Sequence, residues 1–214
     1  PWNYSFNKGD NLETIVKTLK YQTKSVDEKI TILEWWNIFD IDELLTNKWY
    51  IKKWDFIKET SSIKNYKDKY LFLKDAITLE GFLYPDTYFV NKNTFTISSF
   101  TSILLNNFET KVYDKILTKL SSKEILEIIN IASIVEKEVN KENPEEIKIV
   151  SWILIKRYKE NWMIWADITA CYSYSLTSEQ CKMNLSKYIY EKNDYNTRTK
   201  TWLPKTPISN PQYS

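Results

Sequence analysis

Glycine is nearly absent from this chain, which has 214 residues but only Gly9 and Gly81. Average usage of about 7% predicts roughly 15 glycines in a protein of this length. Turns and helix ends with a positive φ angle normally use glycine, because it has no Cβ atom. The glycine that stands in the segment TLEGFLYPDTYFV, residues 78–90, therefore needs an explanation.

Histidine is absent altogether, and cysteine occurs only at Cys171 and Cys181. The absence of histidine excludes histidine-ligated metal sites, Ser-His-Asp triads and Cys-His dyads. Two cysteines are too few for a disulfide framework or a cysteine-rich zinc site, so we expect no metal. Their spacing of ten residues allows one bridge, but two free buried thiols fit the sequence at least as well.

Long apolar runs and an excess of charge of one sign are also missing. No stretch reaches the about 18 apolar residues that a membrane span requires, and no signal peptide begins the chain. Thirty basic and 28 acidic residues give a net charge of +2, which provides no basis for nucleic-acid binding. The chain begins at Pro1 without a methionine and ends in SNPQYS, which indicates a fragment trimmed at both ends.

The residues that are present have an ordinary globular composition, with 43% hydrophobic and 27% charged residues. Alternation of β-branched residues predicts a strand over 29–34. Asp10, Ser122 and Pro144 stand at suitable positions for helix starts. Apolar periodicity predicts helices over 10–20, 38–47, 53–60, 67–79, 98–118, 122–139 and 143–161. After Met163 the composition is typical of a loop, so the predicted fold class is α+β, mainly helical with a small sheet.

Tryptophan, in contrast, is abundant, and several of the nine residues stand where glycine is expected. Trp49 follows the end of one predicted helix, Trp54 precedes the next, and Trp162 follows a later helix end. Bulky residues rarely adopt the positive φ angles that are common at such positions. One interpretation is an aromatic-rich binding surface, as in carbohydrate sites. The other is that glycine codons were read as tryptophan, because UGA encodes different residues in different genetic codes; UGG codons at these positions would exclude it.

Several segments occur in the order of one family's motifs. LEGFLYPDTYFV at 79–90, IASIVEKEV at 131–139, the stretch 150–172 and YNTRTKTWLPKTPISNP at 195–211 resemble motifs of the YceG-like endolytic murein transglycosylases. PWNYSF at the start and ITILEWW at 30–36 resemble the segments where a small LysM-like subdomain ends and the catalytic part begins. Trp36 falls on a family aromatic. The tryptophans that fall on family glycines are Trp2, Trp35, Trp152, Trp162 and Trp202.

The resemblance implies two parts: the remnant of a LysM-like subdomain over 1–28, and a C-terminally truncated catalytic domain over 29–214. It also implies a lyase that needs no cofactor and acts on peptidoglycan glycan strands, with peptidoglycan synthases as partners. Its expected location is the extracytoplasmic face of the bacterial cytoplasmic membrane, held by an N-terminal anchor absent from this chain. The sequence departs from the family pattern at Ile168, Arg198, Lys205 and Thr206, where the family has Pro, Tyr, Pro and Gly.

A single carboxyl group performs the reaction that the resemblance implies, first as acid and then as base. Glu136 and Glu138 are candidates, but they point about 200° apart on one helix and cannot act as a close pair. The residues three, four and seven positions before Glu138 are more apolar than those before Glu136, which favours a raised pKa for Glu138. The family resemblance also puts the catalytic glutamate at Glu138.

Other polar residues of the motifs have two interpretations each. Glu80, Asp86 and Tyr88 either bind sugar hydroxyls or brace the loop beside Gly81, and Tyr84 and Tyr88 either stack on sugar rings or pack. We expect Arg157 to pair with a carboxylate such as Asp167.

The remaining candidates lie nearer the end of the chain. Asp167 and Thr169 either shape the cleft or, for Asp167, cap a helix over 168–176. Asn196 and Asn210 either bind N-acetyl groups or cap turns.

Two other functions remain open at this point. The first is a non-catalytic peptidoglycan-binding or division-complex module of the same fold. The second is a water-using muramidase, which would leave reducing ends in place of anhydro ends. The products of a muramidase and of a transglycosylase differ by the mass of one water, so mass spectrometry distinguishes the two enzymes.

Overall fold

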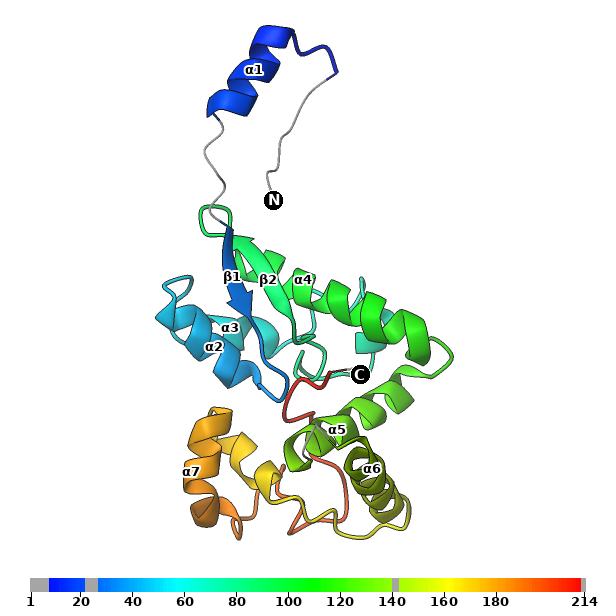
Figure 1. Cartoon of the computed structure of the whole chain (residues 1–214). Helices are drawn as coiled ribbons and strands as arrows, with labels where there is room; N and C mark the ends of the chain where they lie inside the picture. The colour runs from blue at the N-terminus through cyan, green and yellow to red at the C-terminus, as the bar shows by residue number, and fades with distance from the viewer. Residues whose placement is uncertain (1–7, 22–26, 140–142, 213–214) are drawn as a thin grey trace.

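Helices make up most of the structure, a computed structural model that describes residues 8–21, 27–139 and 143–212 (Figure 1). The fold class is α+β, as predicted. The elements in chain order are α1 (Leu12–Tyr21), β1 (Asp27–Thr31), α2 (Ile38–Asn47), α3 (Asp55–Thr60), the 3₁₀ helix η1 (Leu71–Leu73), β2 (Thr87–Asn91), α4 (Ile97–Phe108), the π-helix η2 (Glu109–Leu117), α5 (Ser122–Glu138), α6 (Pro144–Lys159), the 3₁₀ helix η3 (Asp167–Tyr174) and α7 (Ser178–Tyr188).

The small sheet pairs β1 with β2 in antiparallel register, with Ile30 opposite Tyr88. Ile30 is fully buried and Tyr88 nearly so, which places one face of the sheet on the core. Beyond the last pair, the backbone N–H of Ile32 donates to the carbonyl of Asp86 at 2.9 Å. The predicted strand over 29–34 therefore exists but begins two residues earlier, and its partner is the end of the 78–90 segment.

Two groups of elements meet at the 78–90 segment. Figure 1 shows the sheet with α2, α3 and α4 above, and α5, α6 and α7 below, with the C-terminal end of the chain between them. The upper group has an aromatic core, in which the ring of Phe72 lies 5.7 Å from Phe82 and 4.9 Å from Phe108. Burial of such rings is the main source of stability here, because the hydrophobic effect scales with buried apolar area.

Helix starts follow the predicted chemistry with shifts of one residue. The N-cap of α5 is Ser121, not Ser122, and it forms a capping box with Glu124. The side chain of Asn11, not that of Asp10, accepts the N–H of Thr14 at the start of α1. Pro144 begins α6 as predicted.

Three regions differ from the prediction. Residues 67–79 form successive tight turns and the short η1, because Tyr70, Phe72 and Leu73 are all fully buried and no single helix face could bury them together. The predicted helix over 98–118 is α4 followed by the wider turns of η2. Beyond Met163 the predicted loop contains η3, which largely matches the helix over 168–176 that one interpretation of Asp167 implied, and α7, which was not predicted. The capping box that Thr177 forms at the start of α7 was a missed signal.

Cys171 and Cys181 form a disulfide that joins η3 to α7, with Cα atoms 5.6 Å apart. The spacing alone left bridged and free thiols open. The structure resolves this point because η3 packs against α7 and both cysteines are buried.

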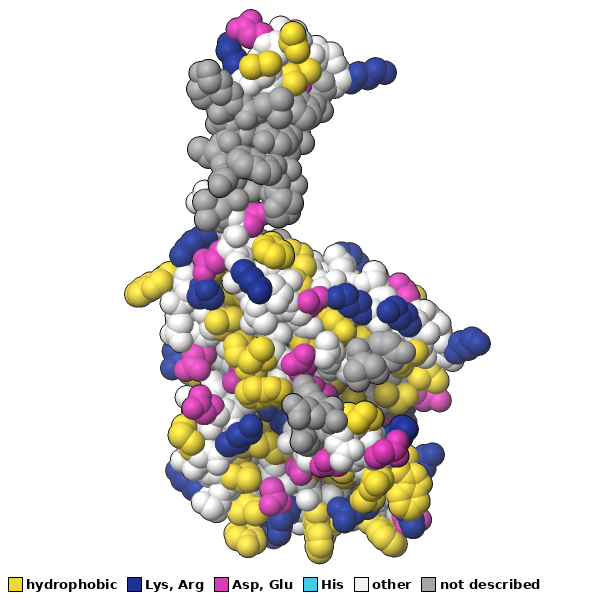
Figure 2. Space-filling model, viewed as in Figure 1, with side chains coloured by type: hydrophobic (Ala, Val, Ile, Leu, Met, Phe, Trp, Pro, Cys, Tyr) yellow, Lys and Arg dark blue, Asp and Glu magenta, His cyan; other side chains and the backbone are white. Residues whose placement is uncertain are grey.

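The N-terminal subdomain expected over 1–28 stays a prediction, because residues 1–7 and 22–26 lie outside the described part. In Figure 1, α1 lies away from the other elements. Within the described residues, no helix combines the length and apolar character needed to cross a membrane. Figure 2 shows Lys and Arg side chains interspersed with Asp and Glu on the visible face, in line with the balanced composition.

Gly81 is required by backbone angle and by space. Its φ angle is +91°, and a Cβ atom there would lie 2.7 Å from Ile129 Cγ2 and from Pro207 Cβ. Real Cβ atoms essentially never approach other heavy atoms so closely. The segment 78–90 therefore passes between α5 and the C-terminal loop at a point where only a glycine fits.

Tryptophan occupies glycine-like backbone at several sites. Trp49 and Trp54, both expected at such positions, have φ angles of +61° and +77°. After α6, however, Asn161 takes the left-handed conformation, so the expectation for Trp162 is wrong. Among the described residues, the tryptophans with positive φ angles are Trp35, Trp49, Trp54 and Trp165. A bulky residue with such an angle is an outlier, which supports the hypothesis that these positions are glycines.

Replacing Gly81 with alanine should lower the free energy of unfolding by about 3 kcal/mol, since strain and a steric clash add. Gly9→Ala is the matched control, because Gly9 also has a positive φ angle but a Cβ atom added there would meet nothing within 4 Å. The free energy of unfolding of the Gly9→Ala variant should fall by only about 1 kcal/mol. Urea denaturation of both variants checks this, and equal losses would contradict the close-contact argument.

Replacing Trp49 with glycine should raise the free energy of unfolding by about 1 kcal/mol, because the left-handed backbone is relieved. Little packing is lost, since Trp49 is 85% exposed. Trp152, exposed within α6, provides the opposite test: Trp152→Gly should lower stability by roughly 0.5–1 kcal/mol. Thermal unfolding measures whether each substitution raises or lowers the stability. A change in the same direction for both variants would exclude the backbone explanation.

Candidate functional site

The C-terminal turn of α5 carries three consecutive charged residues, Glu136, Lys137 and Glu138. Successive residues of an α-helix point about 100° apart, so each side chain meets different surroundings. One faces a groove beside α6, one points into the interior, and one faces η3. These three environments define the chemistry that this end of α5 can perform.

Glu138 is the last residue of α5 and has a raised pKa. Burial of the carboxyl by surrounding protein is the main cause, and the negative charge of Asp167 in η3 adds to it. The partial negative charge at a helix C-terminus acts in the same direction. The side chain as a whole is still exposed, so solvent screens part of these effects. A carboxyl that is reachable and has a raised pKa is suited to act as a general acid.

Asp167 pairs with Arg198, whose Nη1 contacts its carboxylate. The expected partner, Arg157, instead donates to the backbone carbonyl of Ile164 at 2.7 Å. That prediction was therefore wrong, because the end of α6 turns Arg157 toward the following loop. Asp167 is also not a side-chain N-cap: it is the first residue of η3, whose N-cap, Ala166, has no capping side chain.

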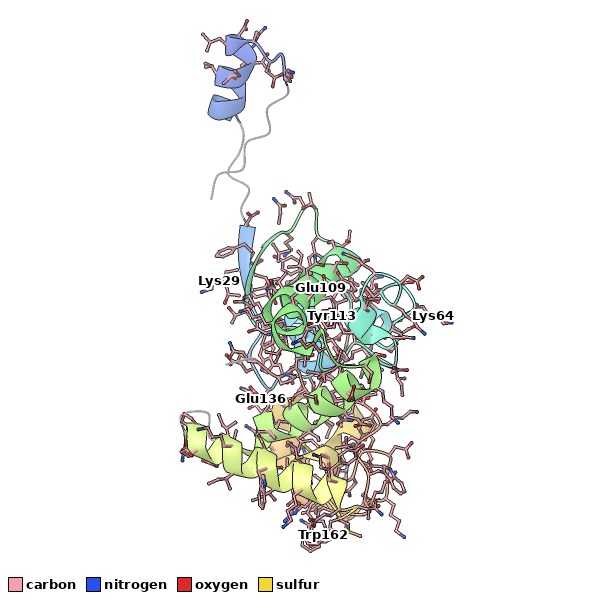
Figure 3. All side chains as sticks on the ribbon, turned by 90° about the vertical axis from the view of Figure 1, so that its right-hand side faces the viewer. Lys29, Lys64, Glu109, Tyr113, Glu136 and Trp162 are labelled. Atoms are coloured by element: carbon pink, nitrogen blue, oxygen red, sulfur yellow. A yellow bond between two sulfur atoms is a disulfide. The ribbon has the colours of Figure 1, made fainter. Side chains whose placement is uncertain are left out.

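Glu136 lies on the other side of α5 and lines a groove of about 660 Å³ between α5 and α6. Figure 3 labels Glu136 at the C-terminal part of α5, above α6. The apolar stripe of α5 lines the same groove; its members are Ile128, Ala132, Val135 and Val139. Glu138 does not line it. The structure therefore offers two places for carboxyl chemistry at this end of α5: Glu136 in the groove, which Glu127 and Lys159 also line, and Glu138 outside it.

Lys137 points inward and its Nζ donates to Ser178 Oγ at 2.8 Å. Ser178 Oγ in turn donates to Asp40 Oδ2 at 2.6 Å, and the Ser178 N–H donates to Asp40 Oδ1 at 2.9 Å. Burial lowers the pKa of Lys137 to about 8, while the charges of Asp40 and Glu80 oppose that change. The lysine therefore ties α5 to α2 and α7 through a buried polar chain.

Glu80 is fully buried one residue before Gly81. Its Oε2 accepts the N–H of Ile38 at 2.9 Å and the hydroxyl of Tyr172 at 2.7 Å. Its Oε1 accepts Nδ2 of Asn210 at 2.7 Å. Burial raises the pKa of Glu80 to about 7, although the hydrogen bonds from Ile38 and Tyr172 and the charge of Lys137 act in the other direction. Of the two interpretations, the contacts of Glu80 match bracing of the loop.

Asn210 completes the same network from the C-terminal end. Its Oδ1 accepts the N–H groups of Gly81 and Leu83 at 2.8 and 3.0 Å. Its Nδ2 donates to Glu80 and to the carbonyl of Trp36. The amide is fully buried and engaged at both ends, so its contacts match the turn-capping interpretation.

Asp86 and Tyr88 also hold the sheet and loop. Asp86 pairs with Lys111 and accepts the N–H of Thr87 at 2.7 Å. The hydroxyl of Tyr88 donates to the carbonyl of Tyr84, and burial raises its pKa. Tyr84 and Tyr88 are both about 5% exposed, so they pack in the core in this structure.

Thr169 and Asn196 brace the 195–199 loop against η3. Thr169 Oγ1 donates to the carbonyl of Ala166 at 2.6 Å and accepts the Thr197 N–H at 3.1 Å. Asn196 Nδ2 donates to the carbonyl of Glu191 at 2.7 Å. Both residues are fully buried, so they act on any ligand through the position of this loop and of its neighbour Arg198.

Four residues of the buried network were missed by sequence reasoning: Asp40, Lys137, Tyr172 and Ser178. A signal for Lys137 was present, because it continues the buried face of α5 formed by Asn130, Ser133 and Ile134. A charged residue on a buried helix face needs a partner of opposite charge. The partners come from segments distant in sequence and had no local signal. Among the described residues, no cluster of His, Cys, Asp and Glu could hold a metal ion.

The arrangement can be compared with known proteins. A sequence model of the YceG-like family matches residues 2–214. The chain belongs to the YceG-like family. The family is known in general for transglycosylases of the MltG type, so the coarse expectation of a transglycosylase family is met.

A crystal structure of a YceG-like protein from Listeria monocytogenes has the same fold, with a TM-score of 0.69 and 23% identity. The similarity covers 97% of this chain and 71% of that one. At this level of identity the likeness establishes the fold alone. No curated protein sequence matches the chain.

The titration of Glu80 predicts a pH-dependent stability. Because its pKa rises from an ordinary 4.5 to about 7 on folding, the stabilising contribution of its protonated form is complete below pH 4.5. It is lost as the pH rises through 7, by up to about 3 kcal/mol. The free energy of unfolding, measured by denaturation at several pH values between 4.5 and 8, should therefore fall more steeply with pH for wild type than for Glu80→Gln. The same pH dependence in both proteins would show that Glu80 does not titrate in this range.

Proposed function

We propose that this chain is an endolytic murein transglycosylase that cleaves glycan strands after N-acetylmuramic acid and leaves 1,6-anhydro ends. The observation that carries the proposal is Glu138: a reachable carboxyl with a raised pKa, in the family's helix motif. Membership of the YceG-like family supports the same reaction class.

The protonated carboxyl of Glu138 gives its proton to the glycosidic oxygen as the bond from C1 to that oxygen breaks. The C6 hydroxyl of the same sugar then attacks C1, and the carboxylate removes the hydroxyl proton. Glu138 ends protonated, as it began, and no water is consumed. One carboxyl therefore serves as acid and then as base.

A second free carboxylate is the feature that hydrolytic glycosidases add, either as nucleophile or as base for water. Asp167 is the carboxylate whose charge acts on Glu138, and it is engaged by Arg198. An engaged carboxylate is a weaker nucleophile, which favours intramolecular attack by the sugar over a water-using muramidase.

The biological setting is part of the proposal. The substrate is the glycan strand of peptidoglycan, and cleavage of nascent strands would terminate their elongation. Peptidoglycan synthases are the proposed partners. The proposed location is the extracytoplasmic face of the cytoplasmic membrane, through an N-terminal anchor outside this chain.

Glu138→Gln should reduce the release of anhydro-muropeptides from purified murein by at least about 100-fold, because the proton donor is lost. Mass spectrometry of the soluble products measures this. Glu136→Gln is the matched control, since it makes the same chemical change on the same helix turn but in the α6 groove. It should keep most of the activity, and circular dichroism should show both variants folded.

Other outcomes separate the alternatives. Murein binding without any released product from wild type would favour a non-catalytic module. Products heavier by one water would favour a muramidase. Loss of activity in Glu136→Gln with retention in Glu138→Gln would move the reaction to the α6 groove.

A further inference from the structure

The helix α7 buries few of its own side chains. Of its 11 residues, all of them described, only Ser178 and Cys181 are buried. The helix α2, of similar length, buries four apolar side chains. A helix this short is marginal in water unless tertiary contacts hold it. α7 lies at the edge of the lower group in Figure 1, so its position depends on a few attachments.

Two attachments near the start of α7 reach the interior. The N–H and Oγ of Ser178 donate to Asp40, and the same Oγ accepts Nζ of Lys137. One helical turn later, the disulfide joins Cys181 to Cys171 in η3. The first attachment consists of hydrogen bonds and the second is covalent, so the disulfide is the stronger constraint on where α7 can go.

The disulfide and the buried polar network meet at one place. A cavity of about 10 Å³ is lined by both cysteines together with Lys137, Tyr172 and Ser178. Because protein interiors are closely packed, a displacement of the disulfide is passed on to these neighbours. Lys137 directly precedes Glu138 in α5, so the disulfide is coupled to the helix turn that carries this carboxyl.

We propose that the Cys171–Cys181 disulfide is a redox-sensitive clasp. In the oxidised chain it closes α7 onto η3 and keeps Ser178 seated between Asp40 and Lys137. In the reduced chain α7 opens, and the last turn of α5 loses the contact that holds its lysine. This structural role does not depend on catalysis.

The clasp opens by a two-electron reduction, for example by a dithiol. One thiolate of the dithiol attacks a cysteine sulfur, the S–S bond breaks, and the displaced thiolate takes up a proton. The second thiol of the reagent then resolves the mixed disulfide, so the chain ends with two thiols and the reagent with a disulfide. Because both cysteines are buried, the attack follows a local opening of α7, which its few attachments permit.

The regulatory meaning of the clasp rests on the proposed function and its location. Disulfides persist in oxidising extracytoplasmic compartments and are rare in the cytosol. The clasp would therefore close after the chain has left the cytoplasm. The end of α5 would then be fully ordered only in the compartment that holds the proposed substrate.

Hydrogen–deuterium exchange of the wild-type chain, with and without a dithiol reductant, is the direct test. Reduction should speed the exchange of the α7 amides by at least about tenfold, a smaller effect than one disulfide typically has on stability. The amides of α4, in the upper group, should change little. Unchanged exchange over α7 would overturn the proposal.

The double variant Cys171→Ser/Cys181→Ser is the matched control. Without reductant, its α7 amides should exchange as fast as those of the reduced wild type, and adding reductant should change nothing. A response of this variant to the reductant would show that the reagent acts elsewhere in the chain, which would also overturn the proposal.

Acylation of lysine amines, measured by mass spectrometry, tests the coupling to α5. Lys137 Nζ donates to Ser178 in the oxidised structure, so it should be acylated several-fold faster after reduction. Lys148, which is exposed on α6, is the internal control and should react equally in both states. Opening of α7 with no change at Lys137 would exclude the coupling.

Activity separates this inference from the proposed function. Release of anhydro-muropeptides should fall by about tenfold or more on reduction and return on reoxidation, because a small displacement of a catalytic group is costly. If the oxidised protein releases nothing while reduction opens α7, the proposed function fails and the clasp stands. If the oxidised protein is active and reduction leaves α7 closed, the clasp fails and the proposed function stands. Full activity in a reduced chain whose α7 has opened would exclude the regulatory role.

Discussion

The buried carboxyl of Glu80 is the contact on which the arrangement of this protein depends. It joins the first turn of α2, η3 and the C-terminal loop through Ile38, Tyr172 and Asn210. A buried carboxyl without donors is costly, so these segments must stay together for the fold to be stable. The three donors come from positions 42, 92 and 130 residues away in sequence, which makes the network a tertiary constraint and not a local one.

The next residue carries this constraint to α5. Gly81 passes so close to Ile129 and Pro207 that no side chain fits, and this fixes the depth of α5 against the loop. Lys137 fixes its rotation, because its ammonium group reaches the buried Asp40–Ser178 pair. With depth and rotation set, Glu138 is left at the surface beside Asp167. The position of the glutamate proposed as catalytic thus follows from the burial of another glutamate.

Prediction from the sequence was accurate where periodicity and end signals agreed. α2, α5 and α6 were found within about two residues, since each has an apolar face and a capping residue. It failed over 67–79, where aromatic residues are buried on several sides, and over α7, which depends on packing and on the Cys171–Cys181 bridge. Arg157 was assigned the wrong partner because the sequence around an arginine does not indicate which carboxylate it will contact in the folded protein.

The sequence by itself determined the family and the helical framework, because motif order and apolar spacing are properties of the chain. The need for a glycine at position 81 came from the tertiary structure, where Ile129 and Pro207 leave no room for a Cβ atom. The sequence also indicated glycine-like positions at Trp49 and Trp54, since helix ends impose their own backbone angles. Only the tertiary structure decided which polar residues brace the fold and which face solvent. Hydrogen bonds and ion pairs are short-range, and the partners of Glu80, Lys137 and Asp167 are brought within reach only when distant segments pack together.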